Sequence, residues 1–417
     1  MTDNQVAQRQ NKFRFVAKKG SGAFADVIQA ENTKTGQMVA IKRMKQTYKS
    51  IDQIVQLREI QALKVLSQNQ NTVKLLEILF DKSTGRLALV FELMSHDMYQ
   101  TIRHRKTPLP VNQVKWYMFQ ILNGLKASHQ AGFFHRDMKP ENVLVQKNSE
   151  SWTGDIVKLS DFGSARQIGS EFPYTEYIST RWYRPPEVLL SDGIYGQEMD
   201  IFGLGCVMYE LIELHPIFPG KDEFDQMCRI HNVLGTPSTE LIKRLRRNAK
   251  NNPIKAEFQV VKGCGVQTMM TNAKPEVVDI IAKMLEYDPL RRISAQQCLA
   301  HSYFDDFLTV IEEVRKDKKI DETFVKDMED AWKQARNIPV QKTERTQPKE
   351  DTEEAAEKPK PKPKPKTKPT VTKTVNANSA PQIVHPPPEN KTNVVQLGFS
   401  TTGALPTLKK TYYKAGK

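Results

Sequence analysis

Hydrophobic and polar positions divide the chain into a strand-rich part and a helix-rich part. Between Phe13 and about Phe91, short apolar runs predict β-strands: residues 13–16 alternate apolar and polar positions, and the run 39–42 follows a turn at Thr35-Gly36. The exception is 51–66, where apolar residues recur every three or four positions and predict one helix. The first part of the chain is therefore expected to form a small sheet with one helix.

From Tyr99 to about Phe307 the apolar period is that of helices. The longest predicted helices cover 111–129, 199–214 and 277–285. A small strand-rich part before a larger helical part predicts an α+β fold with two lobes and a cleft between them. The sequence shows no self-similar period of about 20–50 residues, which argues against a repeat protein.

The last quarter of the chain changes character. Residues 308–338 have mixed charge and predict one more helix, packed on the body through Phe324 and Trp332. Beyond Pro339 the chain is rich in Lys and Pro and has too few apolar residues to offset the entropy of ordering, so we expect a disordered basic tail. The predicted parts are an N-terminal extension (1–12), a domain (13–307) with lobes 13–93 and 94–307, a helical extension (308–338) and the tail (339–417).

Composition and charge narrow the class of protein. Half of the net charge of +14 lies in residues 311–417, and 12 of the 24 prolines lie between Pro339 and Pro406, so the charge is not a property of the globular body alone. No apolar run approaches the roughly 20 residues that span a bilayer, and the first ten residues do not resemble a signal peptide. The four cysteines stand far apart, which predicts neither a disulfide framework nor a zinc site and indicates a reducing compartment, the cytoplasm or the nucleus.

Three features of the first part suggest phosphate chemistry. Gly20-Ser21-Gly22 lies between two predicted strands, and glycines let backbone N–H groups approach phosphate oxygens, although an ordinary hairpin turn has the same composition. Lys42 lies in a partly buried strand and needs an anion, because an unpaired buried ammonium is costly. Glu59 shares the inward face of the predicted helix and supplies that anion. A structural ion pair without any ligand remains the alternative at this point.

The helical part contains two further motifs. His135-Arg136-Asp137-Met138-Lys139-Pro140-Glu141-Asn142 is followed by Asp161-Phe162-Gly163. Together with the glycine-rich loop, Lys42 and Glu59, these motifs form an ordered set over some 140 residues. On this set, residues 13–307 resemble a eukaryotic protein kinase.

The resemblance implies a role for each residue of the set. Phosphoryl transfer depends mainly on positioning and charge neutralisation. Lys42 would hold the α- and β-phosphates of ATP, with Glu59 orienting it. Asp137 would accept the proton of the substrate hydroxyl, and Lys139 would neutralise the γ-phosphate. Lys139 followed by Pro140 is the serine/threonine version of this loop.

The resemblance also implies the ligand-binding residues. Asn142 and Asp161 would bind Mg²⁺ through oxygen atoms, which suit a hard cation. Lys19 departs from the family, which usually has an aliphatic residue at that position, but its methylene stem could still cover the adenine. The residues expected around the nucleotide are Lys19, Gly20, Gly22, Val27, Ala40, Lys42, Phe91, Glu92, Met94 and Leu144.

A hydroxyl-bearing loop follows these motifs. Thr175-Glu176-Tyr177 lies where activation-loop phosphorylation sites fall in kinases, and the alternative is an exposed loop with accidental hydroxyls. Arginines that repel one another in the absence of phosphate would gain charge-assisted hydrogen bonds from phosphorylation. The arginines expected to receive phospho-Thr175 are Arg58, Arg136 and Arg166, and those expected to receive phospho-Tyr177 are Arg181 and Arg184.

Longer segments resemble one branch of the kinases. Leu57–Leu63, Thr175–Arg184 and His215–Pro237 are similar to the RCK family of the cyclin-dependent and mitogen-activated group, above all to MOK-type and flagellar-length kinases. Two departures stand outside the catalytic residues: Pro185 replaces the usual Ala, and Asn148–Asp155 lengthens a hairpin. The branch implies a relaxed or proline-directed Ser/Thr preference and a role in cilium or flagellum length, by analogy only.

Alternatives remain open on the sequence alone. A mitogen-activated protein kinase proper and a catalytically weak kinase-fold scaffold are the two runners-up. Tyr177 could be phosphorylated by an upstream kinase or by the enzyme itself. The tail suits acidic or SH3-like protein partners. We do not expect nucleic acid as a partner, because the tail has little aromatic interleaving, and no membrane insertion is expected.

Overall fold

The computed structural model describes the larger part of the chain. The described residues are 12–174, 180–247, 249, 254, 257–270, 272–337 and 394–398. Thr175 and Tyr177, the two predicted phosphorylation sites, lie outside them.

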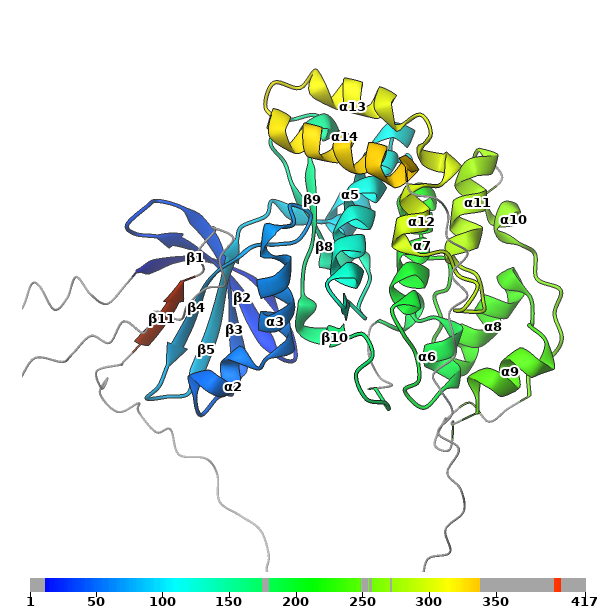
Figure 1. Ribbon diagram of the computed structural model, residues 1–417, viewed down its shortest axis with the longest axis horizontal. Coiled ribbons are helices and arrows are strands. Elements are labelled where there is room, and N and C mark those ends of the chain that lie inside the picture. The colour runs from blue at the N-terminus through cyan, green and yellow to red at the C-terminus, as the bar shows by residue number, and fades with distance from the viewer. Residues whose placement is uncertain are drawn as a thin grey trace, which may run out of the picture. The chain divides into compact units, whose positions relative to one another are not determined.

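The N-terminal lobe is an antiparallel sheet in which strands pair in the order β1-β2-β3-β5-β4-β11 (Figure 1). Buried positions alternate with more exposed ones in part of β3, as the sequence period predicts, while β5 buries three consecutive residues and β1 buries none. The strands are β1 (Phe13–Ser21), β2 (Ala25–Asn32), β3 (Met38–Thr47), β4 (Leu75–Asp81), β5 (Arg86–Glu92) and β11 (Val394–Gly398).

The strand β11 corrects one prediction. We expected all of 339–417 to be a disordered tail, but residues 394–398 form a strand on the outer edge of β4. The reason is that a single short strand cannot satisfy its own backbone N–H and C=O groups. The edge of β4 supplies the hydrogen-bonding partners, and these lie far away in the sequence. The rest of the tail lies outside the described residues.

The single helix expected over 51–66 is also wrong. The structure has α2 (Ile51–Val55) and α3 (Arg58–Val65), separated by Leu57 with an extended backbone at ψ 128°. Ile54 is fully buried and Leu57 packs against the same core, so tertiary contacts compensate the break. The segment has no Gly or Pro that would have signalled it.

The C-terminal lobe is mainly helical, as the sequence predicts, and the α+β fold with two lobes is confirmed. Short strand pairs lie beside these helices: β6 (His96–Asp97), β8 (Val143–Gln146) and β9 (Ile156–Leu159) form one sheet, and β7 (Phe133–Phe134) pairs with β10 (Arg166–Gln167). The helices are α4 (Met98–Ile102), α5 (Val111–Gln130), α6 (Pro186–Leu190), α7 (Glu198–Glu213), α8 (Glu223–Leu234), α9 (Thr239–Leu245), α10 (Val266–Met269), α11 (Pro275–Met284) and α12 (Ala295–Leu299).

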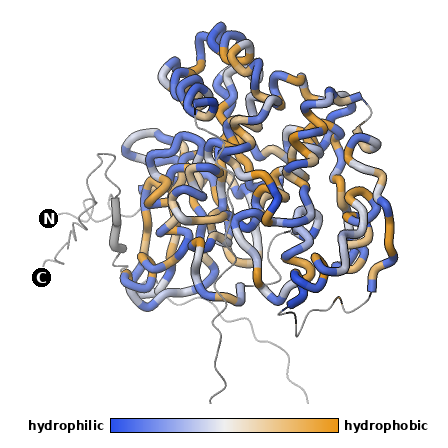
Figure 2. The backbone as a smooth tube through the Cα atoms, turned by 45° about the vertical axis from the view of Figure 1, so that its right-hand side comes forward, coloured by the Kyte–Doolittle hydropathy of each residue, from blue (hydrophilic) through white to orange (hydrophobic). Residues whose placement is uncertain are grey.

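Where the sequence predicts one helix beyond Phe307, the structure has two, α13 (Phe307–Arg315) and α14 (Glu322–Asn337). Phe324 lies edge-on to Trp116 of α5, and the indole Nε1 of Trp332 donates to the backbone oxygen of Phe304 at 2.7 Å. Hydrophilic residues cover the outer turns of this helix pair, at the top of Figure 2. Among the described residues, no helix combines the length and the apolar composition that crossing a bilayer requires.

Candidate active site

The glycine-rich segment forms the turn between β1 and β2. The backbone N–H of Gly22 donates to the oxygen of Ala25 at 2.9 Å, which closes the turn. A Cβ added to Gly20 would meet no atom within 4 Å, so the space beside this backbone is open. Phe24 at the tip is 81% exposed. The loop is thus a hairpin turn with open space along its backbone, the geometry that a phosphate group needs.

Lys42 bridges two carboxylates from different parts of the chain. Its Nζ lies 2.7 Å from Oε1 of Glu59 on α3 and 2.8 Å from Oδ1 of Asp161, which follows β9. Burial by itself would lower the pKa of Lys42, but the two carboxylates outweigh burial and raise it. Burial likewise favours a higher pKa for Asp161, yet Lys42 holds it below its usual value. Both groups are therefore charged at neutral pH.

Asp161-Phe162-Gly163 has a constrained backbone. Asp161 adopts a left-handed conformation, with φ 57°, which non-glycine residues rarely do. Phe162 is fully buried with its ring edge-on to His135, and the ring centroids are 4.9 Å apart. A Cβ at position 163 would lie 3.2 Å from Oδ1 of Asp161 and 3.6 Å from the Lys42 Nζ, so glycine leaves room for the ion pair.

A buried carboxylate on α7 fixes the loop that carries Asp137. Asp200 accepts the backbone N–H groups of His135 and Arg136, each at 2.7 Å, and also contacts the ring of His129. Arg136 is held at φ 69°. The Nε2 of His135 lies 2.7 Å from the backbone oxygen of Ser160, and the Nδ1 of His135 accepts a hydrogen bond from the backbone N–H of Asp137. The loop is thus held by hydrogen bonds on both sides.

Among the described residues, hydrogen-bond donors contact only one of the two carboxylate oxygens of Asp137. Its Oδ2 accepts from the Lys139 Nζ at 2.9 Å and from the Asn142 Nδ2 at 2.8 Å. Its Oδ1 is buried and has no hydrogen-bond partner within the described part of the chain. A buried acceptor without a partner costs free energy, and such groups occur where a substrate or ligand supplies the missing donor.

The oxygen atoms near Asp137 suit a hard cation. Asn142 uses its Nδ2 to donate to Asp137, which leaves its amide oxygen available as a ligand. Asp161 contributes a carboxylate that is 48% exposed. The described residues contain no group of three or more His, Cys, Asp and Glu side chains arranged to hold a metal. Two protein oxygens with the remaining positions left to phosphate and water is the pattern that Mg²⁺ prefers, so the residues fit the cation.

The residues expected around adenine come from both lobes. Val27 and Ala40 are on neighbouring strands β2 and β3, Leu144 is on β8, and all three are partly exposed. Phe91 is buried near the end of β5, Met94 is buried two residues beyond that strand, and Lys19 is exposed on β1.

Glu92 has a role that the sequence did not reveal. Its carboxylate accepts hydrogen bonds from the Lys158 Nζ, at 2.7 and 2.9 Å, and from the backbone N–H of Lys74, at 2.8 Å. The side chain is thus occupied by contacts within the protein, and only the backbone of Glu92 is available to a nucleotide. Lys158 lies among buried residues of β9. A lysine in an otherwise apolar strand was the signal that singled out Lys42, and the same signal was present here.

The structure places two of the three arginines expected at phospho-Thr175 beside one tyrosine. Arg136 Nη1 lies 2.9 Å from the Tyr195 hydroxyl. Burial raises the pKa of Tyr195, and the positive charges of Arg136 and Arg166 act to lower it. The Nε of Arg166 is buried, with no hydrogen-bond partner among the described residues. Arg58 is exposed at the start of α3, which packs against 162–164.

The two arginines expected at phospho-Tyr177 share an acidic partner. Arg181 and Arg184 lie 3.4 and 3.3 Å from Oε1 of Glu223, the first residue of α8. Glu223 was not singled out from the sequence, because only the fold brings α8 next to these arginines.

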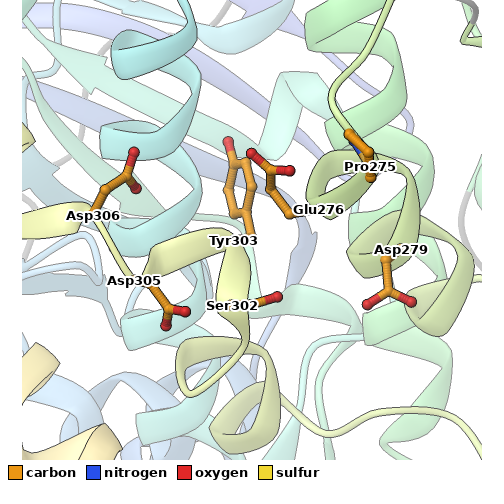
Figure 3. Close-up of a pocket in the computed structure, with 7 residues that line it drawn as sticks. All are labelled: Pro275, Glu276, Asp279, Ser302, Tyr303, Asp305 and Asp306. Carbon is orange, nitrogen blue, oxygen red and sulfur yellow. The ribbon is translucent and has the colours of Figure 1, made fainter.

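A cavity of about 650 Å³ lies in the helical lobe, between α11 and the turn at Ser302 (Figure 3). Its carboxylates are mostly paired within the protein: Asp306 with Lys115, Asp305 with Arg336, and Asp279 with Lys283 and His301. None of the catalytic candidates lines it.

Comparison with known proteins identifies the family. The protein kinase domain family matches residues 13–304. The chain belongs to the protein kinases. It is 42% identical over 294 residues to the human MAPK/MAK/MRK overlapping kinase, covering 70% of this chain and 68% of that protein. It is 37% identical over 294 residues to the human serine/threonine-protein kinase MAK, covering 70% of this chain and 45% of that protein.

These relatives place the kinase in the RCK family of the cyclin-dependent and mitogen-activated group, as the sequence predicted. It is a serine/threonine protein kinase, and proteins are its substrates. The lengthened hairpin after Asn148 has a structural partner in this kinase, because the hydroxyls of Ser149 and Thr153 both donate to Asp317, at 2.5 and 2.9 Å, between α13 and α14.

Proposed function

We propose that Asp137 is the group that accepts the proton of the Ser or Thr hydroxyl when this kinase transfers the γ-phosphate of ATP. The observation that carries the proposal is the buried Oδ1 of Asp137, which has no partner among the described residues while Oδ2 is saturated by Lys139 and Asn142. One oxygen is held in place and the other is left to accept. A general base must lie within hydrogen-bond reach of the proton it takes, and this arrangement leaves one position for that hydroxyl.

The neighbouring charges are assigned to the nucleotide. Lys42, held between Glu59 and Asp161, orients toward the α- and β-phosphates, and Lys139 neutralises charge on the γ-phosphate. Asn142 and Asp161 hold Mg²⁺, which when bound neutralises the charge that develops on the phosphate oxygens. Adenine lies between Val27 and Ala40 on one side and Leu144 on the other. Lys19, Gly20 and Gly22 cover the nucleotide, with the backbone of Glu92 and Met94 at its edge.

Turnover with purified protein tests this assignment against the scaffold alternative. The full chain and an Asp161→Asn variant are incubated with Mg·ATP and a generic Ser/Thr substrate, and phosphate incorporation is measured. Incorporation by the wild type and its loss in the variant support the assignment. Nucleotide binding without incorporation by the phosphorylated wild type would favour a scaffold instead.

We further propose that phosphorylation of Thr175 and Tyr177 activates the kinase. Three observations support a site for phospho-Thr175: Arg136 contacts Tyr195, the buried Nε of Arg166 has no partner among the described residues, and Arg58 begins α3, the helix that carries Glu59. A phosphate on Tyr177 would compete with Glu223 for Arg181 and Arg184. Thr175→Ala and Tyr177→Phe are each expected to lower specific activity at least about tenfold, and full activity in both variants would contradict the proposal.

The source of the Tyr177 phosphate separates this kinase from a mitogen-activated kinase proper. Phosphopeptide mapping of the wild type and of Asp161→Asn, expressed side by side, gives the answer. Phosphate on Tyr177 of the wild type alone indicates autophosphorylation. Phosphate on both, when an upstream dual-specificity kinase is present, indicates activation by that kinase.

Substrate preference and cellular role are proposed from the resemblance to the RCK family and from the sequence. We propose a Ser/Thr preference that is relaxed or directed by a following proline, cytoplasmic or nuclear residence, and a role in cilium or flagellum length. The tail is proposed to bind acidic or SH3-like partners. A peptide array with the doubly phosphorylated kinase, read against Asp161→Asn, measures the preference at each position. Equal labelling with and without proline at the following position would reject proline direction.

A further inference from the structure

The outer edge of β4 carries a strand from the far end of the chain. β4 bonds to β5 on one side, and on the other it pairs antiparallel with β11 (Figure 1). The register runs from Val394 opposite Asp81 to Gly398 opposite Glu77, so all five residues of β11 face β4 residues. Without β11, this edge would present unpaired backbone groups, which proteins usually cover.

The composition of β11 differs from that of the tail around it. Val394–Gly398 contain no charged residue and no proline, and no proline occurs between Pro388 and Pro406. The tail before it alternates Lys and Pro through 358–366. Proline cannot donate to a strand ladder, and lysine and proline discourage edge pairing. This is therefore a part of the tail suited to lie on a sheet edge.

The pairing is expected to be weak and reversible. Backbone hydrogen bonds to β4 replace bonds to water and stabilise only slightly in net terms, while ordering the segment costs conformational entropy. A strand of five residues is therefore held weakly. β11 belongs to the same chain as β4, so its local concentration at this edge exceeds that of any separate chain at ordinary protein concentrations. Covalent attachment thus makes a weak contact populated.

We propose that the edge of β4 is a strand-docking site that Val394–Gly398 occupy in cis, and that this occupancy masks the edge against extended segments of other chains. Release of β11 frees the edge from Glu77 to Asp81. The freed edge accepts an extended, uncharged peptide segment by the same antiparallel addition.

Hydrogen exchange of the full-length protein tests the docking. Val395→Pro/Gln396→Pro removes two consecutive N–H groups, and because successive N–H groups point to opposite sides of a strand, one of them faces β4 in any register. The matched control is Thr401→Pro/Thr402→Pro, two prolines in the same tail outside β11. The β4 amides that face β11 are expected to exchange at least about tenfold faster in the first variant than in the wild type and the control, while the β4 amides that face β5 and the amides of β2 and β3 are unchanged.

Two further measurements complete the test. A synthetic peptide of residues 391–400, added at millimolar concentration to Val395→Pro/Gln396→Pro, is expected to restore protection of the β4 amides. Equal β4 exchange in all three proteins would overturn the proposal. Protection of wild-type β4 that disappears on dilution, together with a dimer in light scattering, would also overturn it, because the strand would then come from a second copy.

Discussion

Asn142 donates from Nδ2 to both the backbone oxygen of Asp137, at 2.7 Å, and its carboxylate Oδ2, at 2.8 Å. The two contacts fix the orientation of the carboxylate about its own backbone. They leave Oδ1 as the remaining acceptor in a buried position. A preorganised acceptor needs no reorganisation when substrate binds, and this gives the first prediction.

Replacing Asp137 by Asn should lower kcat by about 10²–10⁴ while changing the KM for ATP little, because an amide fills the same space but cannot accept the hydroxyl proton. Steady-state kinetics at saturating peptide substrate measure both constants. The matched control is Asp155→Asn, the same chemical change at a buried carboxyl outside the site, which should keep kcat within about twofold. An Asp137→Asn enzyme with nearly full kcat would refute the assigned role.

Breaking the Lys158–Glu92 pair should weaken the segment that we propose to contact adenine. Lys158→Met leaves the Glu92 carboxylate with only the Lys74 N–H, so its position at the end of β5 is less fixed. We expect a several-fold rise in the KM for ATP and a coupling energy of about 0.5–3 kcal/mol in a double-mutant cycle with Glu92→Gln. If the effects of Lys158→Met and Glu92→Gln on the free energy of unfolding and on the KM for ATP are additive, the contact does not position the end of β5.

The Arg292–Glu187 pair should be important for stability and not for chemistry. Both side chains are nearly inaccessible, at 0% and 2% exposed, and the guanidinium meets both carboxylate oxygens, at 2.5 and 2.9 Å. Arg292→Met leaves a buried carboxylate without its partner and should cost about 3–5 kcal/mol in urea denaturation. Glu187→Met/Arg292→Met should be less destabilised than the sum of the single variants. Strict additivity would argue against direct coupling.

Asp155 gives a pH-dependent prediction. Burial raises the pKa of Asp155 to about 6, although the hydrogen bond from Tyr117 opposes the shift. The folded protein therefore keeps a proton that the unfolded chain has lost above its ordinary pKa of 3.8. The resulting stabilisation is complete below pH of about 4 and is lost as the pH rises through about 6.

Asn at position 155 carries no such proton, so Asp155→Asn should gain stability relative to the wild type as the pH rises from about 5 to 7.5. With solvent screening taken into account, the expected gain is about 1 kcal/mol. Urea denaturation of both proteins at the two pH values measures it, and the comparison cancels every other titrating group. A difference in free energy of unfolding that does not change with pH would refute the raised pKa.

Much of the site could be predicted from residues close together in sequence. The loop from His135 to Asn142 contains the carboxylate of Asp137, the ammonium of Lys139 and the amide of Asn142 within eight positions. The spacing of these groups alone indicates the chemistry of the loop. Lys42 and Glu59 could be paired because a buried charge requires a counter-charge and few candidates faced inward. Lys158 obeyed the same rule, but its partner Glu92 lies 66 residues away, and no local pattern connects them.

The sequence by itself determined the two-lobed α+β fold, the kinase motifs and the residues that we propose to bind phosphate, because periodicity and motif spacing are properties of neighbouring residues. Only the tertiary structure decided the break at Leu57, the sharing of Glu223 by Arg181 and Arg184, the second helix beyond Phe307 and the docking of β11 on β4. Each of these depends on what packs beside a segment from elsewhere in the chain. Such contacts change the free energy of a local conformation by as much as its own propensity does, and no window of sequence contains them.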